Sequence, residues 1–175
     1  MLAVIKKSVA VLVFAVFALC VFAQEAKQAA PDPSALKQFT RSGKFDGITL
    51  YFVLMNNKTV EALFQPPTMY AMRARANMAT MLYVQGTPDK DGSLNTDFTL
   101  EQDGQSQEGT AHNIKNFKAG SVVKGERIDG ILQFEKKIDP GHAFVVKNSE
   151  GAVEFQLTPE ALKMLEPPPA QPDKQ

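Results

Sequence analysis

Short apolar runs separated by turn-forming residues recur through the middle of the chain, over residues 41–165. In the clearest run, 128–134, apolar and polar residues alternate with the two-residue period of a strand that buries one face. Asp103-Gly104 and Asp139-Pro140-Gly141 are strong turn signals between such runs. A chain divided so often favours many short strands over a few long helices.

These signals predict about seven strands. The best defined cover 48–55, 98–100, 128–134, 144–146 and 153–157. Along the runs at 128–134 and 153–157, the strand period places Leu132, Phe134, Val153, Phe155 and Leu157 inside, and Glu135, Glu154 and Gln156 in water. Thr158-Pro159-Glu160 predicts the start of a short helix, because Thr caps helices, Pro suits the first position and Glu suits the first turn. That helix should end by Glu166.

Two neighbouring segments are harder to assign. Residues 56–58 have the composition of a turn, and 60–64 predicts a further short strand that ends before Pro66. Residues 69–84 are rich in Ala, Met and Arg, which favours a helix, yet apolar and polar residues alternate there. The alternation favours a strand over the whole segment, and a helix over 69–76 remains the alternative.

Without crossover helices between the strands, a parallel α/β sheet is not expected. The fold class that the pattern predicts is an antiparallel, immunoglobulin-like β-sandwich over 41–165, with a short C-terminal helix. A small antiparallel β-barrel is the alternative. Residues 24–40 are rich in Gln, Ala and Pro and have no period, so they predict a flexible tether. Residues 166–175 predict an extended proline-rich tail.

The first 23 residues have the features of a secretory signal peptide. Lys6 and Lys7 precede an apolar run that is shorter than the roughly 20 residues of a bilayer span, and the run ends in Val21-Phe22-Ala23. We expect cleavage after Ala23. The alternatives are an uncleaved N-terminal anchor and a lipoprotein modified at Cys20, although the bulky Leu19 disfavours the second.

The single cysteine of the chain lies in this segment, so the cleaved protein would have no disulfide and no thiolate ligand. Exported eukaryotic domains are often rich in disulfides, and a cysteine-free domain fits the periplasm or exterior of a bacterium better. Lys and Arg together number 19, as do Asp and Glu, so no nucleic-acid partner is indicated.

Three stretches carry a resemblance: Asp97 to Gly104 (DFTLEQDG), Lys118 to Gly125 (KAGSVVKG) and Gly130 to Phe134 (GILQF). In this order they resemble the secreted, telokin-like immunoglobulin domains of bacterial exported proteins, over about residues 95–147. The resemblance implies a β-sandwich and brings no shared catalytic residues. The chain departs from antibody-type domains in lacking the core Trp and the disulfide, and residues 105–113 form a polar stretch that this resemblance leaves unexplained.

The acidic loop 87–97 is the best candidate for a metal site. If Asp91-Gly92 took the fifth and sixth positions of a calcium loop, Asp89 would take the third. Thr87 and Phe98 would then stand at the first and twelfth positions, where carboxylates are needed. An acidic connection between strands is the simpler interpretation.

The remaining candidates are also interpreted structurally. His112 and His142 have no local partner and no evident third zinc ligand, and Ser121 does not match a nucleophile motif. Arg73 and Arg75 would share one strand face and could attract an anionic partner, although a solvated face is simpler. The methionine group predicts a core strand in preference to an adaptable or copper-binding surface; it comprises Met69, Met72, Met78 and Met81.

The sequence therefore predicts no catalytic, cofactor-binding or metal-binding residue. The function expected is a non-enzymatic interaction or structural module of the bacterial envelope, with another envelope protein as a possible partner. No stable membrane insertion is expected after cleavage. The alternative function is a periplasmic carrier that holds an apolar ligand inside a β-barrel, among Phe, Met and Tyr side chains.

Overall fold

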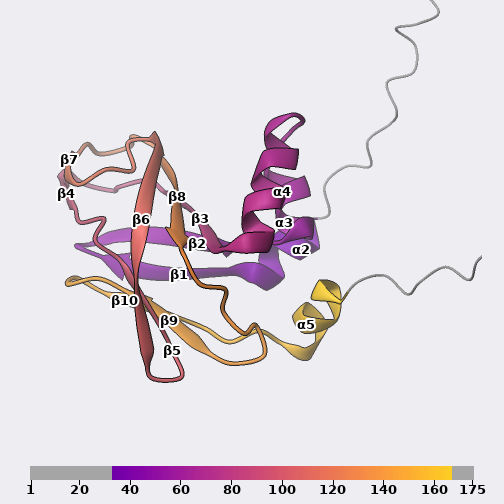
Figure 1. Ribbon diagram of the computed structural model, residues 1–175. Coiled ribbons are helices and arrows are strands. Elements are labelled where there is room, and N and C mark those ends of the chain that lie inside the picture. Colours follow the sequence, from indigo (N-terminus) through magenta and orange to yellow (C-terminus); the bar gives the residue numbers. More distant parts are fainter. Residues whose placement is uncertain (1–32, 167–175) are drawn as a thin grey trace, which may run out of the picture. The chain divides into compact units, whose positions relative to one another are not determined.

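In the computed structural model, which describes residues 33–166, eight strands form one antiparallel, nearly closed sheet (Figure 1). Its order is β1-β2-β3-β8-β6-β5-β9-β10, and β4 and β7 form a small second sheet. The strands are β1 (Thr40–Phe45), β2 (Ile48–Leu54), β3 (Thr80–Gly86), β4 (Gly92–Leu94), β5 (Thr99–Gln102), β6 (Gln105–Lys115), β7 (Gly120–Val122), β8 (Ile128–Phe134), β9 (Phe144–Lys147) and β10 (Ala152–Phe155). The helices are α2 (Pro33–Phe39), α3 (Asn57–Leu63), α4 (Thr68–Met78) and α5 (Pro159–Leu165).

The long strand β6 connects two groups of strands. Its first part pairs with β5 as far as Glu108, and its second part pairs with β8 from Gly109 onward. The β5–β6 hairpin turns through Asp103 and Gly104, both with positive φ, as a tight two-residue hairpin turn requires. The other side of the sheet is almost closed, because the Arg41 guanidinium on β1 donates to the Gln156 carbonyl just after β10 at 2.7 Å.

The space enclosed by the sheet is filled by aromatic side chains. Phe45, Phe52 and Phe98 pack edge to face, with ring centroids 5.3–5.7 Å apart. Phe117 also lies inside, against Gly130, where a Cβ would overlap its ring. We call the buried residues of this space the interior cluster; its fully buried rings are Phe39, Phe45, Phe52, Phe98, Phe117, Phe134, Phe144 and Phe155.

A second buried cluster lies on the outer face of the sheet, where α3 and α4 cover β2, β3 and β8. Strands β3 and β8 are buried on both faces, because alternate residues enter the interior and this second cluster. We call it the flank cluster; its buried members are Val53, Met55, Val60, Met69, Ala76, Met81, Tyr83 and Ile131.

Local capping fixes where two of the helices begin. The Asn56 side chain accepts hydrogen bonds from the backbone N–H groups of Lys58 and Thr59, and the Thr59 hydroxyl accepts from the Asn56 N–H. This reciprocal capping box turns the chain from β2 directly into α3. Thr158 caps α5 by accepting from the Ala161 N–H, as the sequence predicts, and α5 ends at Leu165.

The structure confirms a mainly β, antiparallel fold and the strands predicted near 48–55, 80–84, 98–100, 128–134, 144–146 and 153–157. The alternation on β10 is confirmed, and the inward positions predicted on β8 are buried, but the opposite face of β8 is buried as well and is not in water. Phe134 and Phe155 are fully buried, while Glu135 and Glu154 are exposed. The short turn predicted at 139–141 is present, since the His142 N–H donates to the Asp139 carbonyl.

Several local predictions are wrong. Residues 69–76 belong to helix α4, so the alternation there does not mark a strand, and 56–64 forms a cap and helix α3 in place of a turn and a strand. The polar stretch 105–113 is part of β6, the longest strand described. Within the predicted tether, 33–39 is helical and Phe39 is fully buried, so packed structure begins before Arg41.

The predicted signal peptide, the start of the tether and the tail from Pro167 lie outside the described residues. None of the helices within 33–166 is long and apolar enough to span a membrane.

Candidate functional site

The acidic loop does not gather its carboxylates around one point. Asp91 accepts a hydrogen bond from the Lys124 N–H at 2.8 Å, which links this loop to the segment after β7. Ser93 donates to Asp46 at 2.8 Å, and the Asp97 N–H donates to the Asn95 side chain. Among the described residues, no three His, Cys, Asp or Glu side chains lie close enough together to hold a metal ion.

The two histidines lie on different elements. His112 is exposed on β6, and His142 follows the turn at 139–141. The His142 Nδ1 lies 2.9 Å from Asp103 Oδ2, and this hydrogen bond raises the pKa of His142 above its ordinary value. Ser121 is exposed on the short strand β7. The structure therefore does not bring these sequence candidates together.

The arginines and methionines also separate. Because α4 is a helix, Arg73 and Arg75 do not share a face, and Arg73 pairs with Glu61 on α3 at 2.5 Å. Met69 and Met81 are buried in the flank cluster, while Met78 at the end of α4 is 73% exposed. The methionine group is thus mainly core, but it joins a helix to a strand rather than lying on one strand.

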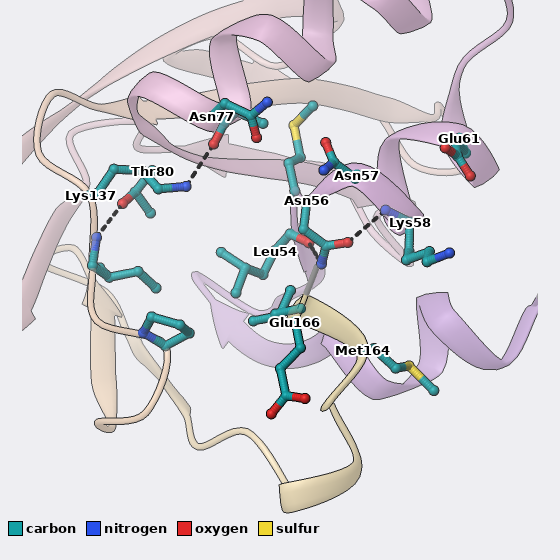
Figure 2. Close-up of a pocket in the computed structure, with 15 residues that line it drawn as sticks. Leu54, Asn56, Asn57, Lys58, Glu61, Asn77, Thr80, Lys137, Met164 and Glu166 are labelled. Atoms are coloured by element: carbon teal, nitrogen blue, oxygen red, sulfur yellow. Dashed lines mark hydrogen bonds between the residues drawn. The ribbon is translucent and has the colours of Figure 1, made fainter. Parts of the chain in front are cut away.

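A pocket with a volume of about 440 Å³ lies among the helix ends (Figure 2). Its walls are the end of β2, the start of α3, the end of α4, the loop after β8 and the end of α5. We call it the helix-end pocket; its lining is Leu54, Met55, Asn56, Asn57, Lys58, Glu61, Ala76, Asn77, Thr80, Lys137, Ile138, Pro140, Met164, Leu165 and Glu166. Its size falls within the roughly 300–1,000 Å³ typical of ligand sites.

The floor of the helix-end pocket is apolar and belongs to both clusters. Leu54, Ile138 and Met164 are part of the interior cluster or pack against it, whereas Met55 and Ala76 belong to the flank cluster. The pocket therefore forms where the two clusters meet and neither fills the space between α4 and α5. An apolar group that entered would be removed from water on several sides.

One wall is fixed by Thr80, the first residue of β3. The Thr80 hydroxyl donates to the Lys136 carbonyl and accepts from the Ile138 N–H, both at 2.8 Å. Thr80 is only 2% exposed, so these two bonds satisfy a buried hydroxyl and hold the loop after β8 in place. This arrangement directs Lys137 toward the end of α4.

Lys137 places its ammonium against the end of α4. Its ammonium donates to the Ala76 carbonyl in the last turn of α4 at 2.7 Å (Figure 2). That carbonyl is near the end of the helix, where cations bind favourably. Although the side chain as a whole is exposed, partial burial of the ammonium lowers the pKa of Lys137.

Two carboxamides and a second lysine complete the polar rim. Figure 2 shows Asn57 and Asn77 on one side of the pocket, above Leu54, and Met164 and Glu166 on the opposite side. Within residues 33–166, the side chains of Asn57 and Asn77 take part in no hydrogen bond, in contrast to Asn56. The rim can therefore both donate and accept hydrogen bonds.

A second polar group lies on the outer face of the sheet. Arg127 contacts both carboxylate oxygens of Asp129, at 2.6 and 2.8 Å, and the Tyr83 hydroxyl donates to Asp129 at 2.7 Å. Burial, together with the bond to Asp129, raises the pKa of Tyr83, and the bond to Asp129 raises that of Arg127. Because each group satisfies another, we interpret this trio as a structural link between β3 and β8.

No protein family, curated protein or solved structure matches this chain. The site therefore stands on its geometry alone. Sequence reasoning did not single out Lys137, Asn57 or Asn77, because they come from three elements and form no motif. One signal was present: Asn-Asn-Lys-Thr directly after an apolar strand is compatible with a capped helix start.

Proposed function

We propose that this chain is an exported, non-enzymatic interaction module of the bacterial envelope. In this proposal the helix-end pocket receives an apolar segment of another envelope protein. The export part rests on the signal-like residues 1–23 and on the absence of cysteine after them in the sequence. The binding part rests on the pocket.

The observation that carries the proposal is the position of the helix-end pocket relative to the two clusters. Eight phenylalanine rings fill the interior of the sheet, while the pocket opens beside it, between α3, α4 and α5. Its lining provides an apolar floor with amide, ammonium and carboxylate groups around it. Such a lining suits reversible recognition of a chain segment, since apolar burial supplies affinity and polar groups supply orientation.

We infer that the eight strands are arranged as an immunoglobulin-like sandwich, in line with the resemblance to telokin-like domains. The change of partner along β6, at Gly109, supports two facing layers of strands that share β6. A small antiparallel barrel is the second candidate. The hydrogen bond from Arg41 to the Gln156 carbonyl favours it, because that bond links the two edge strands.

The second candidate function is a carrier with an apolar ligand inside a barrel. It needs interior space, which the packed rings of Phe45, Phe52 and Phe98 occupy. A ligand held in the helix-end pocket would be the form of this function that the geometry accommodates best.

Site-specific photo-crosslinking tests the proposal. A photoreactive phenylalanine analogue is placed at Asn77 on the pocket rim in the full chain, expressed in its native bacterium. The matched control carries the same analogue at Val123, which is 51% exposed and follows β7 at the other end of the strands (Figure 1). Mass spectrometry identifies the adducts.

We expect a protein adduct of defined mass at position 77 that is missing or much weaker at position 123. The analogue at position 77 would lie beside the apolar floor, where a bound segment comes within bond-forming distance. Equal adducts at both positions, or none at position 77, would contradict the proposal. A chain retained in the cytoplasm with residues 1–23 intact would contradict its export part.

A further inference from the structure

Three kinds of group surround the helix-end pocket, and together they restrict what can occupy it. The floor is apolar, two carboxamides lie at the rim, and the Lys137 ammonium stands at one wall. An occupant that contacts only the floor would displace water from the polar groups without replacing the hydrogen bonds that they make to it. The occupant should therefore combine an apolar group with polar groups that match the rim.

The ammonium of Lys137 can bind an anion without giving up its present contact. An ammonium has three donors, and the Ala76 carbonyl takes one of them at 2.7 Å. The two remaining N–H groups are available beside the apolar floor formed by Ile138 and Pro140. A hydrogen bond between an ammonium and a carboxylate is about twice as strong as one between neutral groups.

The other charges around the pocket also favour an anionic occupant. Lys58 contributes a second cation to the lining, and the Glu61 carboxylate is paired with Arg73 at 2.5 Å. Glu166 lies on the side opposite Asn57 and Asn77 in Figure 2. The wall at Lys137 is therefore positive, and Glu166 is the one carboxylate of the lining with no ion pair among the described residues.

The carboxamides of Asn57 and Asn77 distinguish a peptide from a simple amphiphile. Each carboxamide offers donors and an acceptor, and each peptide unit offers one donor and one acceptor, so the two pair well. A fatty acid would use the floor and Lys137 but would leave both carboxamides unmatched. All three features of the pocket are used only by a polypeptide with a nearby carboxylate.

We infer that the helix-end pocket binds the C-terminus of an extended partner polypeptide whose last residue is apolar. The last side chain enters the floor near Leu54 and Met164, and the terminal carboxylate binds Lys137. Asn57 and Asn77 bind the peptide units that precede it. This inference rests on the proposed function and names its partner; capture of a terminal carboxylate is a recurrent mode of peptide recognition.

Fluorescence anisotropy with synthetic peptides tests the inference on the chain recovered from the envelope. The probes are labelled octapeptides that end in leucine, valine or methionine, each prepared as the free acid and as the C-terminal amide. Decanoate serves as a competitor that has the carboxylate and apolar chain but no peptide units. We expect the free acids to bind at least tenfold more tightly than the amides, and decanoate to compete weakly.

Substitutions at Lys137 separate its charge from its contact with α4. Lys137→Met should lower the affinity for free acids to that for amides, whereas Lys137→Arg should retain most of the difference. The matched control is Lys118→Met, an exposed lysine outside the lining, which should leave both affinities unchanged. If Lys137→Met fails to fold, the comparison of acid and amide on the unchanged chain still decides.

Each outcome has a distinct meaning. Equal affinities for acids and amides would overturn the carboxylate inference, while binding of both would leave the proposed function standing. Strong competition by decanoate at the free-acid affinity would show that the ligand is an amphiphile and would overturn the peptide inference. If no apolar peptide of either form binds, the proposed function fails together with the inference.

Discussion

The interior cluster and the flank cluster are built from different side chains and differ in how closely their packing is fixed. The interior is dominated by phenylalanine rings in fixed edge-to-face and stacked contacts, such as Phe144 on Phe155 with centroids 4.7 Å apart. The flank contains Met, Ala and Val, with Phe64 against Tyr83 at its border. Rigid rings determine one packing, whereas unbranched methionines adapt to irregular gaps.

This difference explains where the pocket forms. The interior is enclosed by strands on almost every side, so its rings fill the available space. The flank is covered by α3 and α4, which are short helices joined by a few residues, and by Leu36 of α2. At the end of α4 the cover stops, and the floor that remains is shared by Leu54 and Met55, one from each cluster.

The largest effect is expected in the interior. Phe134 is fully buried, so Phe134→Ala should lower the free energy of unfolding by about 3–5 kcal/mol through lost burial and a cavity. Urea unfolding followed by circular dichroism measures the change. The matched control is Glu154→Ala, at an exposed position of β10. Its free energy of unfolding should stay within about 0.5 kcal/mol of that of the unchanged chain. Similar losses for both variants would show that the assigned faces are wrong.

A smaller effect is expected in the flank, at the start of α3. Asn56→Ala removes the acceptor for two backbone N–H groups, so it should cost roughly 0.5–2 kcal/mol. Asn56→Asp keeps an acceptor at the same place and serves as the control. The same urea series measures both, and a loss as large as that of Phe134→Ala would remove the distinction between a fixed interior and a locally capped flank.

The sequence reveals the interior well because its signal is local. Phe134 and Phe155 alternate with Glu135 and Glu154, and this period predicts that both rings point inward. The turn at Asp103-Gly104 and the Thr158 cap are also local, since neighbouring residues provide the required φ angles and hydrogen bonds. These parts of the fold were predictable.

The flank and the pocket were not predictable because they depend on contacts distant in sequence. Residues 69–76 alternate like a strand, but Met69 and Ala76 are seven positions apart and share the buried side of a helix against β3. The polar residues of 105–113 show no apolar face because the exposed strand β6 is held by backbone bonds to β5 and β8. Lys137 reaches the Ala76 carbonyl only because the loop after β8 passes beside the end of α4.

The smallest effect on stability is expected at an exposed hydrogen bond between two side chains on the strand side of the molecule. His142 Nδ1 is hydrogen-bonded to Asp103, which, with the charge of Asp139 nearby, raises the pKa of His142 above 6.5. Because folding raises this pKa, any stabilisation from the pair is complete below pH 6.5, the pKa in the unfolded chain, and is lost as pH rises through the higher value of the folded chain.

The imidazole signals of His142 in an NMR titration report that pKa directly, and Asp103→Asn should shift it back toward 6.5. Both side chains are exposed, so the melting temperature of Asp103→Asn should stay close to that of the unchanged chain at neutral pH. A His142 that titrates at or below 6.5 would contradict the hydrogen bond to Asp103. A large loss of stability in Asp103→Asn would mean that the strand side depends on its surface as well as on its buried rings.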